Sequence, residues 1–415
     1  MRCLPAVSLT LGLAFASTAQ ALYTWETVTL PASSGASCGN GTPYRFFVNT
    51  ALLTRNLVVE MEGGGACWDQ RACEGQGALS ANNPDGIPAN HMTSLNTAAG
   101  LVAPFTTRLN AIQPVRTQFW NQAYLPYCTG DVHTGAKLRV YGDADPAHPR
   151  VQHHRGQANV RAAAAWLRAN LGKPDQLLVT GFSAGGVGAT ANYGVLRDAL
   201  APTGRASLIA DSGPLYPAPR GGTAAQYPSL ALHNRIRDAW GLDDPGSLLA
   251  SFAGQAGFDT NDLGSLSQAL ALRYPGDRFA YAVFGADEIF SAFSYAKFDP
   301  QVAAAAGSAQ LALLTQRFQQ DIDHWLPALG TRPNIGWYVP WYRNLVGSHC
   351  LSIIDFSNTG IEAQRVASFA SFVDNTLDRG APMRVREAAN AADAQRPLSV
   401  PATVMGFLLG LFGVT

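Results

Sequence analysis

The sequence is poor in charge and in cysteine, and each shortage narrows the possible functions. Only 14% of the 415 residues are charged, and 29 Lys and Arg balance 29 Asp and Glu, so the formal net charge is zero. A chain with no basic patch and no acidic tail is not typical of proteins that bind nucleic acid, so we expect no such partner. Six cysteines without zinc-ligand spacing argue against a structural zinc site, and we expect neither a metal nor a cofactor. Internal repeats at solenoid or propeller periods are also missing.

The first 21 residues have the pattern of an export signal. Arg2 supplies a positive region, residues 7–16 (VSLTLGLAFA) are apolar, and residues 19–21 (Ala-Gln-Ala) fit the small-x-small cleavage rule. We therefore predict a signal peptide over 1–21 and a secreted mature chain that starts at Leu22. A buried N-terminal helix is the alternative.

Export would carry the chain into an oxidising compartment, where cysteines pair. Five cysteines remain after cleavage, so at least one is free or pairs outside the chain. Cys67 and Cys73 enclose a short loop and form one candidate pair. Cys38 with Cys128 is a second candidate, and whether Cys350 is free stays open.

Buried strands alternate with helical patterns along most of the chain. Apolar segments predict strands over 56–62, 175–182, 206–213, 278–287 and 334–341, and helical spacing of apolar residues predicts helices over 156–172 and 309–326. This alternation predicts an α/β fold of the α/β-hydrolase type, with a mostly parallel central sheet and helices on both faces. The polar region 69–152 has little periodicity and is expected to be loop or insertion over the core.

The C-terminal end differs in character from the predicted domain, which covers 22–379. Residues 380–396 are charged and rich in alanine, and we assign them to a linker. Residues 397–415 carry no charge and approach the minimum length for spanning a bilayer. Pro401 and the missing positive flank weaken that interpretation. A tail that attaches the protein to a surface or membrane and a helix docked on the domain both stay open.

Residues 181–185 (GFSAG) form a G-x-S-x-G motif between a predicted strand and a predicted helix. This context is typical of a strained turn that raises the serine hydroxyl above the edge of the sheet. The glycines avoid collisions with neighbouring backbone, and the following helix N-terminus offers free N–H groups. We therefore predict that Ser183 is a nucleophile. The alternative is a glycine-rich turn that contains a serine by chance.

A serine nucleophile needs a base, and the base needs an acid to orient it. In this fold the chain order is serine, acid, histidine. His349 follows the last predicted strand in a loop of small residues, so it is the predicted base. His233 and His324 are the alternatives, and both lie in helical patterns.

Asp287 is the predicted acid, because it ends the strand 278–287. Glu288 is adjacent and competes with it. Asp211 also ends a strand, but that strand comes early for the acid, so Asp211 is better suited to holding loops together by hydrogen bonds.

The oxyanion of an acyl-transfer intermediate needs preorganised N–H donors. The residue after the nucleophile, Ala184, supplies one. Gly64 and Gly65 directly follow the strand 56–62, and glycine lets the backbone approach a substrate oxygen, so they are the candidates for the second. A merely flexible turn is the alternative.

Several segments, in order along the chain, resemble those of the pectin acetylesterases and the related Notum-type carboxylesterases. They are the oxyanion-like segment 61–69 (MEGGGACWD), the segment 127–135 (YCTGDVHTG), the nucleophile segment 181–189 (GFSAGGVGA), residues 210–213 (ADSG) and the Ser-His pair at 348 and 349. The resemblance covers most of residues 38–375. It implies a Ser183–His349–Asp287 triad, oxyanion donors at Gly64, Gly65 and Ala184, and the disulfides Cys67–Cys73 and Cys38–Cys128.

The chain also departs from the family it resembles. Gly65 and Ala66 stand where animal Notum members have aromatic residues, so their lipid-accommodating pocket is not implied here. Fewer cysteines are present, which removes several of the family's disulfides.

Together, the residues and the resemblance predict a secreted serine carboxylesterase that removes short acyl groups, above all acetyl. An acetylated polysaccharide such as pectin is the expected substrate. The alternatives are an extracellular lipase or polyester depolymerase with the same triad, a peptidase, and a non-catalytic binding protein on the same scaffold.

Two features have competing interpretations. Residues 141–156 contain several aspartates and histidines but match no standard metal spacing, so a polar loop is favoured over a metal site. Four tryptophans, Trp68, Trp120, Trp337 and Trp341, are candidates for a carbohydrate platform, although buried packing is the commoner fate of this residue.

Overall fold

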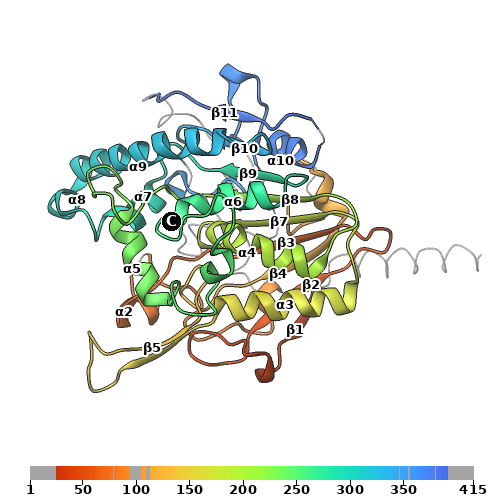
Figure 1. Ribbon diagram of the computed structural model, residues 1–415, viewed down its shortest axis with the longest axis horizontal. Coiled ribbons are helices and arrows are strands. Elements are labelled where there is room, and N and C mark those ends of the chain that lie inside the picture. Colours follow the sequence, from red (N-terminus) through yellow and green to blue (C-terminus); the bar gives the residue numbers. More distant parts are fainter. Residues whose placement is uncertain are drawn as a thin grey trace, which may run out of the picture.

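The computed structural model describes residues 25–77, 79–93, 104–108, 113–344, 346–353, 356–378 and 380–390. The predicted export signal 1–21 and the apolar tail 397–415 lie outside these residues. Within them the chain folds around a nine-stranded sheet, and a separate two-stranded hairpin lies at its side (Figure 1). No helix in this described part is both long enough and apolar enough to cross a membrane.

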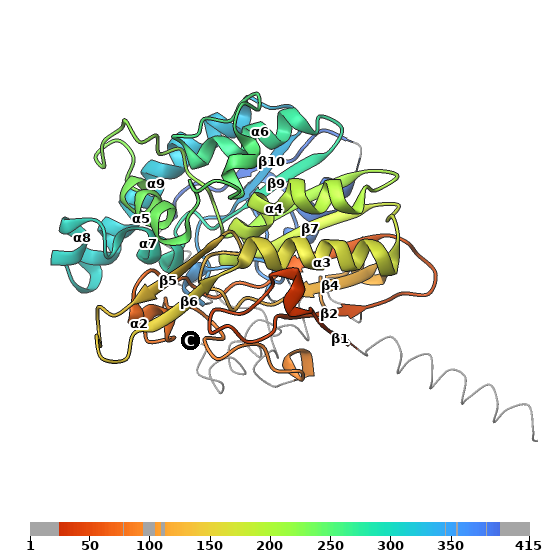
Figure 2. The same cartoon turned by 60° about the horizontal axis from the view of Figure 1, so that its bottom comes forward.

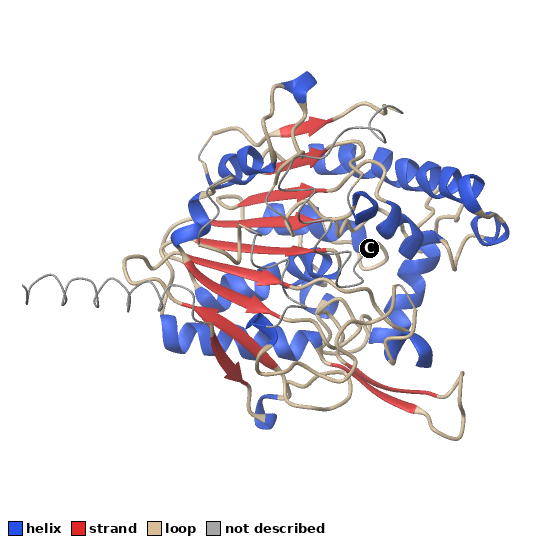
Figure 3. Cartoon of the chain, turned by 180° about the vertical axis from the view of Figure 1, so that it is seen from behind, coloured by secondary structure: helices blue, strands red, loops and turns tan. Residues whose placement is uncertain are grey.

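The central sheet has the strand order β1-β2-β4-β3-β7-β8-β9-β10-β11, and its strands lie side by side in Figure 3. At one edge, β1 (Glu26–Thr29) and β2 (Arg45–Asn49) run antiparallel to their neighbours. Every neighbouring pair from β4 to β11 is parallel. These strands are β3 (Leu57–Met61), β4 (Asn121–Leu125), β7 (Leu177–Phe182), β8 (Ala206–Asp211), β9 (Arg278–Ala282), β10 (Ile335–Val339) and β11 (Arg384–Arg386).

The central strands are buried on both faces, which explains their continuous apolar sequences. Val59 lies beside Val179 in the register of β3 and β7, and both belong to the larger hydrophobic core. Val58 and Leu178, one residue earlier in each strand, belong to the smaller core on the opposite face. The predicted α/β-hydrolase-like fold with a mostly parallel sheet is thus confirmed.

Helices cover the two faces unequally. On the larger core, α3 (Gly156–Leu171) packs against α4 (Ala184–Leu200), and α4 lies on β7 and β8 (Figure 2). On the smaller core, α10 (Phe369–Leu377) contacts β8, β9 and β10. The other α-helices of the described residues are α2 (Gln70–Cys73), α5 (Leu230–Trp240), α6 (Leu266–Arg273), α7 (Glu288–Tyr295), α8 (Pro300–Ala304) and α9 (Gly307–Gly330).

Two expectations from the sequence are wrong. The region 69–152 is not only loop, because it contributes β4 to the central sheet and forms the hairpin of β5 (Lys137–Tyr141) and β6 (Arg150–His154). Residues 384–386 are not linker, because they form β11 and pair with β10. β4 begins with polar Asn and Gln, and β11 has only three residues, two of them Arg, so neither has the apolar run that marks a buried strand.

The two predicted disulfides are present. Cys38 is bonded to Cys128 and Cys67 to Cys73. Cys350 is a buried free thiol.

Candidate active site

Ser183 occupies a tight turn between β7 and α4. Its backbone has φ 54° and ψ −124°, a conformation that a residue with a side chain rarely adopts. Hydrogen bonds hold it there: the Ser183 N–H donates to the carbonyl of Asp211 at 2.9 Å, and the Ser183 carbonyl accepts from the N–H of Gly186 at 2.9 Å. This is the strand–turn–helix geometry in which a serine hydroxyl is exposed above the sheet.

The glycines of the motif are required by close packing. A Cβ atom at Gly185 would overlap the carbonyl oxygen of Met61 in β3, and one at Gly181 would overlap the carbonyl of Gly185. The helix therefore starts directly against the end of the neighbouring strand, as the motif predicts.

His349 and Asp287 come together from two loops at the same end of the sheet. Asp287 follows β9 and is 1% exposed, and His349 follows β10 and is 8% exposed. Their Nδ1 and Oδ2 atoms are 2.7 Å apart. The second oxygen of Asp287 accepts from the N–H of Phe290 at 2.8 Å and caps α7. The cap of α7 therefore holds the carboxylate in position for its contact with the imidazole.

This contact determines what the other imidazole nitrogen can do. Because Nδ1–H donates to Asp287, the neutral ring leaves a lone pair on Nε2, which is buried and has no hydrogen-bond partner among the described residues. Burial alone would lower the pKa of His349, but the charge and hydrogen bond of Asp287, with the charge of Asp211, outweigh it and raise this pKa above its ordinary value.

The alternative acids and bases occupy other environments. Asp211 accepts hydrogen bonds from the N–H and hydroxyl of Ser352, at 2.8 and 2.7 Å, and so anchors the loop that carries His349. Burial raises the pKa of Asp211 to about 6. His233 is buried in α5 with its pKa lowered by burial to about 3, and His324 lies on α9 against the ring of Tyr227.

The glycine loop after β3 lies beside the serine turn. Gly65 has φ 59°, and a Cβ there would overlap the carbonyl of Ser80, so this position requires glycine. No hydrogen bond of the described chain uses the N–H of Gly64, Gly65 or Ala184 as donor. These three groups are therefore available to a substrate oxygen.

The segments 61–69 and 127–135 contact each other at this loop, a contact that the sequence alone did not indicate. Burial lowers the pKa of His133 to about 4, so its ring is neutral at pH 7. Its Nε2 donates to the carbonyl of Glu62 at 2.9 Å, and the N–H of Cys67 donates to the carbonyl of Gly130 at 2.8 Å. Both ends of the glycine loop are thus tied to residues 130–133.

A cavity of about 280 Å³ connects these groups. Ser183, Ala184, His349, Gly64 and Gly65 all line it. The rest of its wall is apolar and includes Leu79, Val132, Val187, Ile289, Phe290 and Phe293. A second cavity, of about 220 Å³, shares the side chains of Leu79 and Phe293 as a wall and is also lined by Gln76, Ser80 and Lys297.

Neither the histidines of residues 141–156 nor the four tryptophans form an open binding site in the described part of the chain. In the described part of the chain, the cluster suited to sharing a metal ion is Cys67, Cys73 and His154, and its two sulfur atoms are joined in a disulfide. Trp68 and Trp120 are only 7% and 6% exposed, and Trp337 and Trp341 are partly buried, so the four tryptophans do not form one open platform.

Comparison with known proteins adds a family and a fold. The pectinacetylesterase family model matches residues 16–226. The chain is 24% identical over 107 residues to the inactive palmitoleoyl-protein carboxylesterase notum1b of Danio rerio, a match that covers 25% of this chain and 69% of that protein. It is 21% identical over 226 residues to the palmitoleoyl-protein carboxylesterase NOTUM of Drosophila melanogaster, covering 51% of this chain and 30% of that protein.

The structure is similar to that of the Wnt deacylase Notum from Drosophila. The TM-score is 0.55 at 16% sequence identity, and the match covers 88% of this chain and 97% of that chain. At this identity the similarity supports the α/β-hydrolase-like fold.

Proposed function

The chain belongs to the pectinacetylesterase family and hydrolyses carboxylic esters, and from this premise we propose that it does so with Ser183 as nucleophile, His349 as general base and Asp287 as the acid that orients the base. The observation that carries the proposal is the 2.7 Å contact of Nδ1 with Asp287, which leaves Nε2 of His349 unpartnered in the cavity that Ser183 also lines. The family match ends at residue 226, before Asp287 and His349, so this geometry is an independent argument.

The proposed reaction assigns one step to each of these groups. Nε2 of His349 takes the proton of the Ser183 hydroxyl as Oγ attacks the acyl carbon, and the buried charge of Asp287 stabilises the imidazolium that forms. The imidazolium then gives its proton to the leaving alcohol oxygen, which leaves an acyl-serine. Water then loses a proton to Nε2 as it attacks the acyl carbon, and the imidazolium returns that proton to Oγ of Ser183 as the carboxylic acid leaves.

The oxyanion of each tetrahedral intermediate would be held by the free N–H groups of Gly64, Gly65 and Ala184. Ala184 begins α4, so its N–H has no partner inside the helix, and the positive end of the helix dipole adds to its effect. The tethers from His133 and Cys67 fix the glycine loop before substrate arrives, which is the preorganisation that such a site requires.

The shape of the cavity bears on the acyl group. The sequence led us to expect acetyl, but a cavity of about 280 Å³ with an apolar wall has room for more carbons, since an engineered apolar cavity of about 150 Å³ already binds benzene. We therefore propose that the enzyme prefers acyl chains longer than acetyl. Acetyl esters of polysaccharide stay as the second candidate, because the family description names that activity and the neighbouring cavity offers polar groups to a sugar.

A chain-length series tests both candidates. We expect kcat/KM for p-nitrophenyl esters to rise from acetate to hexanoate, and Ser183→Ala to abolish both turnover and labelling by a fluorophosphonate. Ile289→Trp, which fills the apolar cavity, should lower activity on hexanoate at least about ten-fold while acetate changes little. A maximum at acetate together with acetate release from pectin or xylan would instead favour the polysaccharide. An active Ser183→Ala enzyme would refute the mechanism.

The two disulfides support an oxidising location, since such bonds persist mainly in exported proteins. We therefore propose that the esterase acts outside the cytoplasm, with the apolar C-terminal tail as a candidate surface anchor. Fractionation of the native host, with the tail deleted in a parallel strain, tests this proposal.

A further inference from the structure

The segment that carries His349 is conformationally strained. Gly347, Ser348 and Cys350 have φ angles of 60°, 52° and 63°, and two of these residues carry side chains. Left-handed conformations of such residues persist only where the surroundings hold them. The position of the proposed base therefore depends on whatever fixes this loop.

Arg343 closes the loop on its N-terminal side. The Arg343 N–H donates to the hydroxyl of Ser348 at 2.6 Å, and that hydroxyl donates to the Arg343 carbonyl at 2.6 Å. The residue directly before His349 is thus bound to the backbone of Arg343 in both directions.

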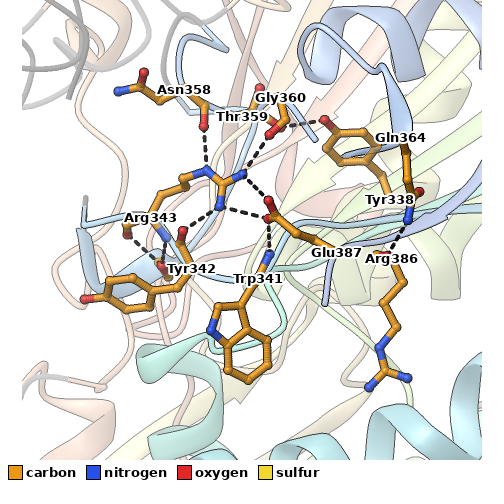
Figure 4. Close-up of polar contacts among 11 residues, drawn as sticks. Tyr338, Trp341, Tyr342, Arg343, Asn358, Thr359, Gly360, Gln364, Arg386 and Glu387 are labelled. Carbon is orange, nitrogen blue, oxygen red and sulfur yellow. Dashed lines mark hydrogen bonds and ion pairs between the residues drawn. The ribbon is translucent and has the colours of Figure 1, made fainter. Parts of the chain in front are cut away.

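The side chain of Arg343 joins the two ends of the loop. Its guanidinium is 4% exposed and donates to the carbonyls of Tyr342 at 2.6 Å, Asn358 at 2.7 Å and Gly360 at 2.7 Å (Figure 4). Tyr342 precedes the segment that bears His349, whereas Asn358 and Gly360 follow it. One buried cation therefore holds both ends of the loop together.

A counter-charge for Arg343 comes from the last described segment of the chain, residues 380–390. Glu387, directly after β11, lies 2.9 Å from Nη1 of Arg343 and accepts from the N–H of Trp341 at 2.7 Å. Its own N–H donates to the carbonyl of Val339, the last residue of β10. The carboxylate therefore fixes both the guanidinium and the backbone that leads from β10 into the loop.

We propose that Glu387 and Arg343 form a positioning pair that holds the His349 loop in its reactive conformation. This inference rests on the proposed function of His349. Removing the Glu387 carboxylate would take a buried ion-pair partner from the guanidinium and would weaken its hold on the carbonyls of Asn358 and Gly360. The segment 380–390 is then part of the active-site architecture.

The adjacent residue provides a matched control. Arg386 is the last residue of β11, and its side chain points away from the pair (Figure 4). It donates instead to Asp323 at 2.8 Å and Gln319 at 2.7 Å on α9. Arg386→Ala removes a more exposed ion pair, that with Asp323, from the residue next to Glu387 and leaves the contacts of the His349 loop in place.

The test compares Glu387→Ala, Glu387→Gln and Arg386→Ala in the full-length protein, with thermal melts to establish that each is folded. We expect Glu387→Ala to lower kcat about 10²-fold with KM nearly unchanged, because displacements near 1 Å have this effect. Glu387→Gln keeps an acceptor for Trp341 and should recover part of the loss. The acid limb of kcat/KM, which reports the base, should move to lower pH in Glu387→Ala as the contact of His349 with Asp287 loosens. Arg386→Ala should match the wild type.

The outcomes separate this inference from the proposed function. If the wild type is active, Ser183→Ala is inactive and folded Glu387 variants keep the wild-type kcat and pH profile, the positioning role is refuted and the triad stands. Equal losses in Arg386→Ala and Glu387→Ala would also refute it, because the effect would then belong to the strand. If the wild type hydrolyses no ester, the proposed function itself fails.

Discussion

Replacing Asp287 by asparagine is the sharpest perturbation of the proposed site. The carboxylate makes two contacts, with Nδ1 of His349 at 2.7 Å and with the N–H of Phe290 at 2.8 Å. An asparagine in its place would have one amide oxygen for these two donors. If the oxygen keeps the cap of α7, the amide NH₂ faces His349 and forces the ring proton onto Nε2, where it blocks the uptake of the serine proton.

The expected effect is large on activity and small on folding. A wrong tautomer at this position costs about 10⁴ in kcat, or about 5.4 kcal/mol of transition-state stabilisation. Asparagine is as good an N-cap as aspartate, so the melting temperature should change by a few degrees at most. KM should stay within a few-fold, because Asp287 does not line the substrate cavity.

The assay is the hydrolysis of a p-nitrophenyl ester across pH 5 to 9, with melting curves for each variant. Glu288→Gln serves as the control, because Glu288 is adjacent to Asp287 and is the competing acid; its kcat should stay near the wild type. Asp211→Asn should be intermediate, since Asp211 anchors the histidine loop through Ser352. A folded Asp287→Asn variant with less than a ten-fold loss in kcat, or a greater loss in Glu288→Gln, would refute the assignment.

Two further predictions concern stability. Burial, with the charges of Asp211 and Glu62 nearby, raises the pKa of Glu60 from 4.5 to about 8. Because the folded protein holds this proton more tightly than the unfolded chain, the free energy of unfolding is greatest below pH 4.5 and falls as the pH rises toward 8. Glu60→Gln should therefore stabilise the protein by up to about 4 kcal/mol at pH 8 and by less than about 1 kcal/mol at pH 5. Equal gains in denaturant melts at both pH values would contradict this. Removing Cys38–Cys128, with a sequence separation of 90, should cost about 4.5 kcal/mol, and removing Cys67–Cys73, with a separation of 6, about 2 kcal/mol. Activity should fall more on removal of Cys67–Cys73, because Cys67 lies beside the glycine loop. A greater loss of activity on removal of Cys38–Cys128 would contradict a role of Cys67–Cys73 in fixing that loop.

The parts of the site that the sequence predicted are those specified by local context. The turn at Ser183 needs only a strand, two glycines and a helix start, and these are contiguous along the chain. The choice of Asp287 over Glu288 followed from a predicted strand over 278–287. In the structure β9 ends at Ala282 and Asp287 caps α7, but Asp287, and not its neighbour, does lie against His349. The chain order serine, acid, histidine then favoured His349, which follows Asp287 and the last predicted strand.

The parts that sequence reasoning missed depend on contacts between distant segments. β4 enters the sheet between β2 and β3, and β11 lies beside β10 more than forty residues later in the chain. Such pairing depends on the tertiary environment more than on local propensity. The charged segment after residue 380 reads as a linker because its composition is polar, yet Glu387 is mostly buried against Arg343.

The division of the chain also bears on substrate choice. The family match, residues 16–226, includes Ser183 and the glycine loop, which are the groups that any ester would use. The wall of the cavity formed by α7, with Ile289, Phe290 and Phe293, comes from the later part of the chain, outside that match. The proposed nucleophile and oxyanion donors therefore lie in the part that matches the family model, whereas the proposed acid and base, Asp287 and His349, and the α7 wall of the cavity lie beyond it. For this reason the family name alone is a weaker guide to the acyl group than the volume and lining of the cavity.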